Sequence, residues 1–225
     1  MDWSPIIISM KTAFASICVT FFFGMALGEL VFCMKNKKLK MVLDGIFTLP
    51  LVLPPTVAGF LLLYLFGIRR PIGKFLMEHF LIKIAFSWEA TVLAAVLISF
   101  PLMYRAARGA FEQVDENLLY AGRTLGMSEW DIFWKVQLPS AKPGIVSGTV
   151  LAFARGLGEF GATAMIAGNI SGKTRTLPLA VYAAVASGDM HEAAKYVAVL
   201  IGFSFFVVVL MNYFAARQTS EKGHS

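Results

Sequence analysis

The strongest constraint on the fold of this chain is a series of long apolar runs. A helix needs about 20 mostly apolar residues to cross the hydrocarbon core of a bilayer, and several runs here reach that length. Of the 225 residues, 57% are hydrophobic and only 15% are charged, whereas soluble domains carry about 25% charged residues. We therefore expect an all-α integral membrane protein that folds as one domain over residues 1–225.

Five of the runs are expected to span the membrane: residues 6–34, 45–68, 86–107, 144–167 and 194–216. A further apolar piece, residues 176–188, is too short to cross comfortably, so we expect it to lie in or dip into the outer leaflet. Counting this piece as a span would give six. No basic segment precedes the first run, which is therefore expected to stay in the membrane and not to be cleaved as a signal peptide.

The basic residues indicate the orientation of these spans. They cluster at the ends of apolar runs, so the net charge of +6 is interpreted as a topology signal and not as a nucleic-acid surface. An orientation with the N-terminus outside and the C-terminus in the cytoplasm places more of them on the cytoplasmic side of the cell (inner) membrane. In that orientation the outer loops hold Arg69, Arg70, Lys74, Lys83, Lys173 and Arg175, and the cytoplasmic side holds Lys35, Lys37, Lys38, Lys40, Arg105, Arg108, Arg123, Lys135, Lys142, Arg217 and Lys222.

The longest polar segment, about residues 108–143, is then a cytoplasmic loop. Part of it has the features of a helix: Ser128 is a plausible N-cap, and Glu129 places a negative charge in the first turn, where the helix dipole favours it. Pro139 is expected to end this helix.

Three aromatic residues of that helix, Trp130, Phe133 and Trp134, have the spacing i, i+3, i+4 and share one face. Two interpretations stay open on periodicity alone. The helix could rest these side chains on the membrane interface, or it could dock them in a groove of another protein.

The spacing of the loop resembles the pattern E-A-A-x3-G-x9-I-x-L-P in the membrane subunits of ATP-binding-cassette (ABC) importers. Here Tyr120 replaces Glu, Gly122 replaces the second Ala and Val136 replaces Ile, while the central Gly126 is kept. The resemblance implies a coupling helix that seats in a cleft of a separate ATPase subunit. The residues expected to couple to the ATPase are Ala121, Gly122, Gly126, Met127, Ser128, Glu129, Trp130, Phe133, Trp134, Leu138 and Pro139.

The second expected span contains Pro50, Pro54 and Pro55, which interrupt its hydrogen-bond ladder. Backbone groups freed in this way are tolerated in a membrane only where protein or water surrounds them. Pro54, Pro55 and the hydroxyl of Thr56 are therefore candidates for a translocation path or gate, and a simple kink is the alternative.

The fourth expected span carries Arg155 and Glu159, four residues apart on one helical face, with Thr163 one turn further. Charges inside a membrane are costly and usually face a bundle interior or a watery cavity. Arg155 could offset the charge of a passing anion, or the two residues could form a structural ion pair. All three residues are expected to lie at the path or gate.

Nothing in the sequence indicates catalysis. The stretch "AGNISGKT" lacks the first Gly of a phosphate-binding loop, because Ala167 stands in its place, and it follows an apolar span, so we expect an external turn. The three histidines, His79, His191 and His224, have no metal-ligand spacing. We expect no cofactor and no metal in this chain, with ATP and Mg bound by the partner ATPase.

Two further stretches, "LPLVLPPTVAGFLLL" and "LGEFGATAMIAGNI", resemble the molybdate importer permeases, and with the coupling loop the likeness covers most of the chain. It implies a type I ABC importer permease fold. It also implies a homodimer that works with two ABC ATPase subunits and an extracytoplasmic molybdate-binding protein. A tungstate or sulfate permease, an importer of another solute and, remotely, an integral-membrane enzyme are the alternatives.

Overall fold

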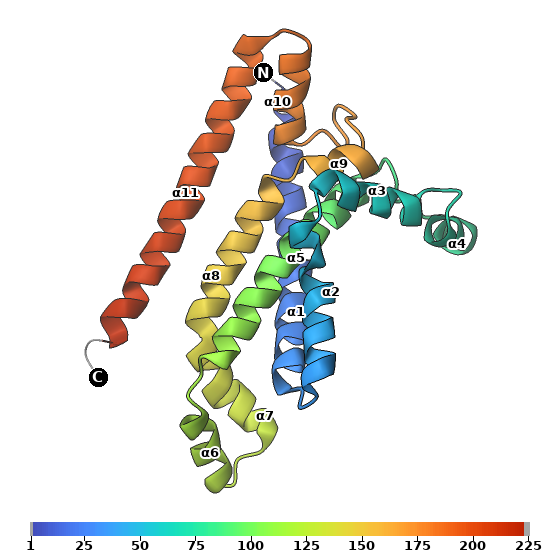
Figure 1. The fold of residues 1–225 in the computed structure, drawn as a ribbon. Helices are drawn as coiled ribbons and strands as arrows, with labels where there is room; N and C mark the ends of the chain where they lie inside the picture. The colour runs from blue at the N-terminus through green and yellow to red at the C-terminus, as the bar shows by residue number, and fades with distance from the viewer. Residues whose placement is uncertain (1, 223–225) are drawn as a thin grey trace.

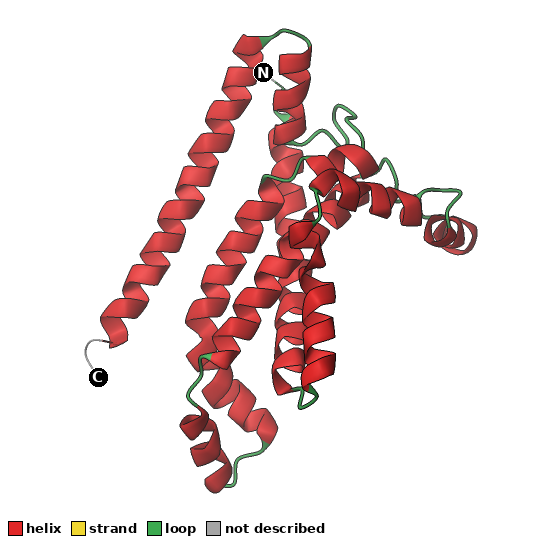
Figure 2. Ribbon diagram, in the orientation of Figure 1, coloured by secondary structure: helices red, strands yellow, loops and turns green. Residues whose placement is uncertain are grey.

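The computed structural model describes residues 2–222, and this part of the chain is helical with no β-strand (Figure 2). The helices follow one another without strands between them, joined by short turns and loops, so the expectation of an all-α protein is confirmed. In chain order they are α1 (Ser4–Cys33), α2 (Lys37–Val52), α3 (Pro55–Phe66), α4 (Pro71–Phe80), α5 (Trp88–Glu112), α6 (Glu116–Thr124), α7 (Glu129–Ile132), the π-helix η1 (Phe133–Gln137), α8 (Leu138–Leu157), α9 (Gly161–Ile166), α10 (Leu177–Ala186) and α11 (Met190–Lys222).

Three helices are long and apolar enough to cross a membrane: α1, α5 and the first 21 residues of α11. The pair α2 and α3 meets the same test only when both are counted together, and it is bent by 110° at its break. The second expected span is therefore a broken helix and not a straight one.

The fourth expected span, residues 144–167, is wrong as a single helix. α8 begins earlier, at Leu138, and ends at Leu157, and the chain turns before the six-residue helix α9. α8 is not among the helices that pass the length and composition test, so five crossings are reached only if α8 and the bent pair are both counted.

The centre of the bundle consists of α1, α5 and α8, which contact one another, with α2 against α5 (Figure 1). α1 presents a stripe of small and polar residues to α5. Thr12 shares a hydrogen bond with Thr91 at 2.9 Å, and Thr20 shares one with Ser99 at 3.2 Å. These bonds satisfy hydroxyl groups that no water would reach in an apolar core, so they fix the register of the two helices.

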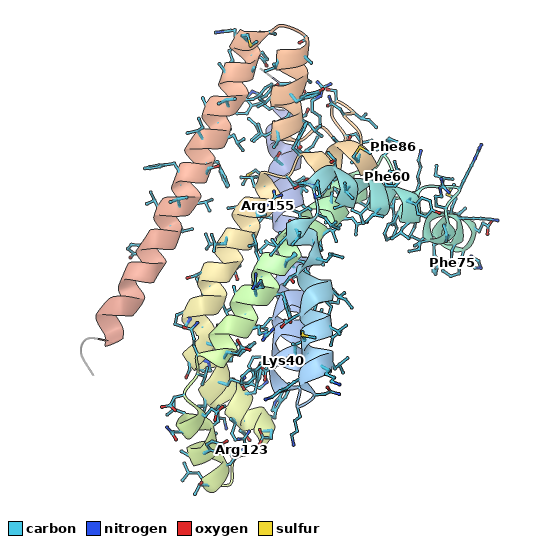
Figure 3. All side chains as sticks on the ribbon, in the orientation of Figure 1. Lys40, Phe60, Phe75, Phe86, Arg123 and Arg155 are labelled. Carbon is cyan, nitrogen blue, oxygen red and sulfur yellow. The ribbon has the colours of Figure 1, made fainter. Side chains whose placement is uncertain are left out.

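The remaining helices extend from this centre. α3 and α4 form a lateral arm, on which Phe60 and Phe75 lie far from Lys40 and Arg123 (Figure 3). The helices α10 and α11 form an antiparallel hairpin beside the N-terminal end of α1 (Figure 1).

Residues 176–188, expected to lie in or dip into the outer leaflet, contain the short helix α10. α10 does not lie flat but runs roughly along the direction of α1 and α11 (Figure 1). Its Leu177 and Ala180 are buried in a cluster with Tyr196 of α11, and the Leu177 N–H donates to Ser9 Oγ of α1 at 2.7 Å. α10 is therefore held by α1 and α11.

Candidate functional site

The loop expected to couple to an ATPase is a compact unit of α6, α7 and η1 at the end of the molecule opposite the N-terminus (Figure 1). The N-cap predicted at Ser128 is confirmed, and a second N-cap, Asp115, was not predicted. Asp115 accepts a hydrogen bond from the Asn117 N–H at 2.9 Å and begins α6. Ser128 Oγ accepts from the Asp131 N–H at 3.1 Å and begins α7. Each cap satisfies one of the free N–H groups of a helix start.

The turn between α6 and α7 depends on Gly126. Its φ is +75°, in the left-handed region that side chains disfavour, and a Cβ atom there would meet nothing within 4 Å. Glycine is therefore needed for its backbone conformation and not for space. Gly122, in contrast, lies against Ile132, whose Cγ1 would be 3.1 Å from an added Cβ. This contact explains why the second Ala of the motif can be Gly here.

An ion pair joins the two short helices across that turn. Arg123 donates from Nε and Nη2 to the two carboxylate oxygens of Glu129, at 2.7 and 3.0 Å. The hydrogen bonds from Arg123 hold the pKa of the Glu129 carboxyl below its usual value. The Tyr120 ring, at the position of the Glu that the motif lacks, lies 5.6 Å from the Arg123 guanidinium. Both charged residues are exposed, so the pair orients the helices more than it stabilises them.

The three aromatic residues of the loop contact one another but differ in burial. The centroids of Trp130 and Trp134 lie 5.6 Å apart, and those of Phe133 and Trp134 lie 5.3 Å apart. Phe133 is half-buried and packs on Phe111 of α5, at 6.2 Å. Trp130 and Trp134 remain 71% and 47% exposed. The loop therefore has an inner aromatic that attaches it to the bundle and an outer pair that is free to dock.

Pro139 does not end the helix, so that prediction is wrong. The chain runs from α7 through η1 into α8 without leaving the helical region, and Pro139 lies in the first turn of α8. The π-helical turn η1 directly precedes Pro139, so the proline does not interrupt a regular α-helical hydrogen-bond ladder. The coupling segment and α8 are consequently one continuous helical rod, with Leu138 partly buried against the core of the bundle.

The candidate path residues of the second span lie at the break between α2 and α3. Pro54 is the N-cap of α3 and Pro55 is its first residue, so the two prolines occupy positions that need no N–H donor. Thr56 is exposed there. The 110° bend at this point turns α3 away from the axis of α2.

The candidate path residues of the fourth span lie at the break between α8 and α9. Arg155 Nη1 is 3.1 Å from Oε2 of Glu159, whose side chain is only 2% exposed. The other oxygen of Glu159 accepts the Ala162 N–H at 2.8 Å, which satisfies one donor at the start of α9. Thr163 is buried in α9. Glu159 therefore has a structural role at this turn, and Arg155 is its partner.

These two breaks meet, so the structure brings the candidate path residues of both spans together. A Cβ on Gly161 would lie 3.0 Å from Pro55 Cβ, and a Cβ on Gly59 would lie 2.6 Å from Ala162 Cα. α3 and α9 can approach this closely only because glycines stand at the crossing. Arg155, in the last turn of α8, lies close to this junction (Figure 3).

The segment that resembles a phosphate-binding loop forms a turn between α9 and α10, so the predicted turn is confirmed, while its position outside the membrane stays a prediction. Gly168 and Gly172 have φ of +70° and +72°, and Thr174 Oγ1 accepts the Ile170 N–H at 3.0 Å. Among the side chains that the structure describes, no three from His, Cys, Asp or Glu gather where they could hold a metal ion.

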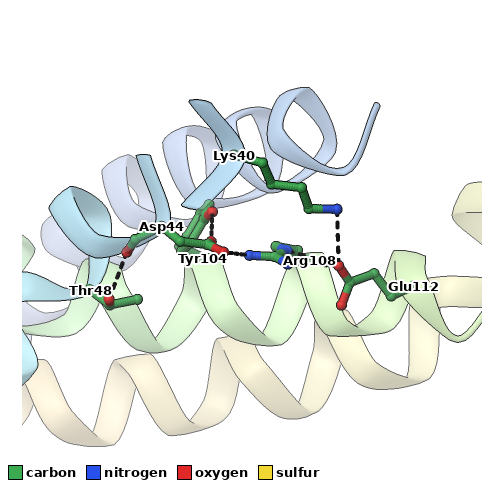
Figure 4. A network of polar contacts seen from close by, with 6 residues as sticks. All are labelled: Lys40, Asp44, Thr48, Tyr104, Arg108 and Glu112. Atoms are coloured by element: carbon green, nitrogen blue, oxygen red, sulfur yellow. Dashed lines mark hydrogen bonds and ion pairs between the residues drawn. The ribbon is translucent and has the colours of Figure 1, made fainter. Parts of the chain in front are cut away.

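One polar network was not anticipated from the sequence. Asp44 of α2 accepts hydrogen bonds from Tyr104 and Arg108 of α5, while Glu112 pairs with Arg108 and, at 3.3 Å, with Lys40 (Figure 4). From the sequence, Lys40 and Arg108 contribute only to the prediction of membrane orientation. Asp44 and Arg108 are 64 residues apart, so no local pattern could have paired them.

Comparisons with known proteins agree with this architecture. The family model described as "Binding-protein-dependent transport system inner membrane component" matches residues 20–220. The Molybdenum transport system permease protein ModB of Escherichia coli (strain K12) is 43% identical over 223 residues, which are 98% of this chain and 96% of that protein. ModB of Haemophilus influenzae is 37% identical over 224 residues, 99% and 97% of the two chains. The putative molybdenum transport system permease protein YvgM of Bacillus subtilis is 38% identical over 212 residues, 93% and 92% of the two chains.

Solved structures with the same fold share little sequence with this chain. An inward-facing structure of the MetNI methionine ABC transporter superposes with a TM-score of 0.74 at 18% identity, covering 96% of this chain and 97% of that one. A bacterial ABC transporter for alginate import gives 0.75 at 12% identity, covering 95% and 78%. These confirm the expected importer permease fold. By the family model and the relatives together, this chain belongs to the family of binding-protein-dependent transport system inner membrane components.

Proposed function

We propose that this chain is the permease subunit of an ATP-driven importer that carries molybdate, or a related oxyanion, into the cytoplasm. Two copies form the pathway, each acting as a single domain over residues 1–225. Two separate ABC ATPase subunits bind ATP and Mg and hydrolyse the ATP. An extracytoplasmic binding protein delivers the oxyanion, and this chain itself binds no cofactor.

The observation that carries this proposal is the exposed pair Trp130 and Trp134 at the tip of a rigid helical unit. Large aromatic side chains that stay exposed at one end of a membrane protein are typical anchors of a protein interface. Because η1 continues directly into α8, a displacement of the docked tip would move α8 and the break at Glu159. ATP-driven closure of the two ATPases could thus be transmitted to the path.

We propose that the path runs past the junction of α3 and α9, where Pro55 and Thr56 lie against Gly161 and Pro54 is the N-cap of α3. This choice is supported by the rule that broken helices within a membrane line protein or water. The substrate class rests on the identity of 37–43% to relatives named as molybdenum permeases. Tungstate and sulfate, as tetrahedral dianions, are the closest alternatives.

The orientation is proposed with the N-terminus outside and the C-terminus in the cytoplasm of the cell (inner) membrane. The N-terminus and the α6–α7 unit lie at opposite ends of the molecule, and the basic segment between α1 and α2 lies at the α6–α7 end (Figure 1). Basic residues favour the cytoplasmic side of a membrane.

Uptake into vesicles that contain the permease, its ATPase and its binding protein tests the function. We expect ATP-dependent accumulation of molybdate, inhibited by excess tungstate more than by excess sulfate. Vesicles with a non-hydrolysable ATP analogue serve as the control. Uptake of sulfate alone would assign the alternative cargo, and no ATP-dependent uptake of any of the three oxyanions would refute the proposal.

A further inference from the structure

We propose that the pocket between the middle of α2 and the C-terminal part of α5 is a weak binding site for a tetrahedral oxyanion at the cytoplasmic mouth of the permease, with Arg105 as its principal ligand. This inference rests on the proposed function, because it takes the imported oxyanion as the occupant. It adds a place where the oxyanion dwells after it has passed the junction of α3 and α9.

The pocket has a volume of about 360 Å³, and its α5 wall is the last part of that helix, which leads directly into α6 of the coupling loop. α2 contributes Asp44, Gly45 and Thr48 to its lining, and α5 contributes Arg105, Arg108 and Glu112. This volume is near the lower end of small-molecule sites, which span about 300–1,000 Å³, so it suits a small ion with some of its water.

The carboxylates of the pocket are already neutralised. Asp44 is bound by Arg108, and Glu112 is bound by both Arg108 and Lys40 (Figure 4). Two carboxylates therefore face two cations within the network, and Arg108 forms an ion pair with each of the two carboxylates. An anion that enters the pocket meets no uncompensated negative charge from these residues.

Arg105 differs from its neighbour Arg108. It is three residues earlier on α5, so it points to the same side of that helix, and it lines the same pocket. Among the described residues it forms no ion pair. Its guanidinium thus adds a positive charge with free N–H donors, and this planar group can bind a tetrahedral oxyanion through two parallel hydrogen bonds.

The backbone also leaves room for such an ion. Gly45 and Gly109 lie on the two walls of the pocket, and an added Cβ at either position would meet nothing within 4 Å. The pocket is open to one side and offers one free arginine, so we expect weak binding. Weak binding fits a release site, because an ion that is held too tightly cannot leave a conduit.

Direct binding to the complex of permease and ATPase tests this site. Equilibrium dialysis with labelled molybdate, in phosphatidylcholine nanodiscs without nucleotide or binding protein, would compare the natural protein with Arg105→Gln. We expect the variant to bind at least about tenfold more weakly at this site, because one charge-assisted bidentate contact is lost. Arg105→Lys should keep part of the affinity, since the charge remains.

The matched control is Arg70→Gln. Arg70 is also an arginine outside an ion pair among the described residues, and its guanidinium lies 4.5 Å from the Tyr64 ring on the lateral arm. This variant should bind molybdate like the natural protein. Equal binding by the natural protein and Arg105→Gln would overturn the inference. Equal binding would say nothing against oxyanion uptake by the natural protein. The proposed function fails only in the separate uptake experiment, if no oxyanion is imported.

A second arm separates a free oxyanion from the phosphate of a lipid headgroup. The dialysis is repeated in nanodiscs that contain phosphatidylglycerol. Molybdate binding that still depends on Arg105 supports the proposal. Loss of that binding in phosphatidylglycerol alone would mean that the anionic headgroup outcompetes the free oxyanion for the pocket, and this result would overturn the proposal that the imported oxyanion occupies it in an anionic membrane.

Discussion

Gln137 donates a hydrogen bond from Nε2 to Oε2 of Glu29 at 2.8 Å, and so ties the end of the coupling segment to α1, 108 residues earlier in the chain. Gln137 is the last residue of η1 and is only 6% exposed. π-helical turns within helices often occur at functional sites. Here the turn directs a buried amide at the first helix, so a movement of the coupling segment acts on α1 as well as on α8.

Replacing Gln137 by leucine should destabilise the permease. Oε2 of Glu29 would lose its donor while Glu29 remains partly buried and keeps only Cys33 Sγ as a donor to Oε1, and an unsatisfied buried polar atom costs about 1–3 kcal/mol. Thermal unfolding of the purified permease in detergent would measure the loss. Gln113→Leu is the control, because Gln113 is exposed just after α5, and an equal shift for both variants would contradict the role of the Gln137–Glu29 bond.

Replacing Gly126 by alanine should impair coupling. A side chain in the left-handed region costs about 1–2 kcal/mol, so the turn between α6 and α7 would relax and shift the tip. We expect the permease to reach the membrane but to import less oxyanion per ATP hydrolysed. Gly202→Ala is a matched control, because Gly202 also has nothing within 4 Å of an added Cβ but lies in the helix α11. A normal transport ratio in Gly126→Ala would argue against a rigid turn.

Replacing Trp130 by alanine should weaken the attachment of the ATPase. Interface anchors of this type contribute 2 kcal/mol or more, which corresponds to a loss of about 30-fold in affinity. The amount of ATPase that co-purifies with the permease in detergent is the readout. Trp3→Ala provides the comparison, because Trp3 is 66% exposed at the opposite end of the molecule. Full retention of the ATPase by Trp130→Ala would return Trp130 to a membrane-interface role.

Local features of this chain could be read from its sequence. The N-cap Ser128, the turn at Gly126 and the shared face of Trp130 and Trp134 depend only on residues within a few positions of one another. Such features follow from helix termini, φ preferences and periodicity. The same holds for the long apolar helices α1 and α5.

Features set by distant contacts could not be read in this way. The sequence shows that prolines interrupt the second span, but not that the break bends by 110° or that Pro55 meets Gly161 of α9. The local sequence around Pro139 does not distinguish a proline that ends a helix from one that follows a π-helical turn inside a continuous helix. The pairing of Asp44 with Arg108 depends on how α2 packs on α5.

Replacing Arg155 by glutamine should destabilise the permease, because it leaves the buried carboxylate of Glu159 without its cation. Breaking a fully buried pair costs about 3–5 kcal/mol, and the cost here should be smaller because Arg155 remains one-third exposed, at 34%. The double variant Arg155→Gln with Glu159→Gln removes both charges, and its amide oxygen can still accept the Ala162 N–H. We therefore expect the double variant to regain most of the lost stability in thermal unfolding.

The same substitutions in the pair Lys74 and Glu78 provide the control, because this pair has the same i, i+4 spacing but is exposed on α4. Exposed pairs contribute about 0–1 kcal/mol, so both its single and its double variants should unfold near the natural temperature. Oxyanion uptake then separates the two roles of Arg155. A structural pair predicts that the stable double variant transports normally, since neither charge acts on the cargo. A double variant that is stable but slow would show instead that Arg155 offsets the charge of the passing anion.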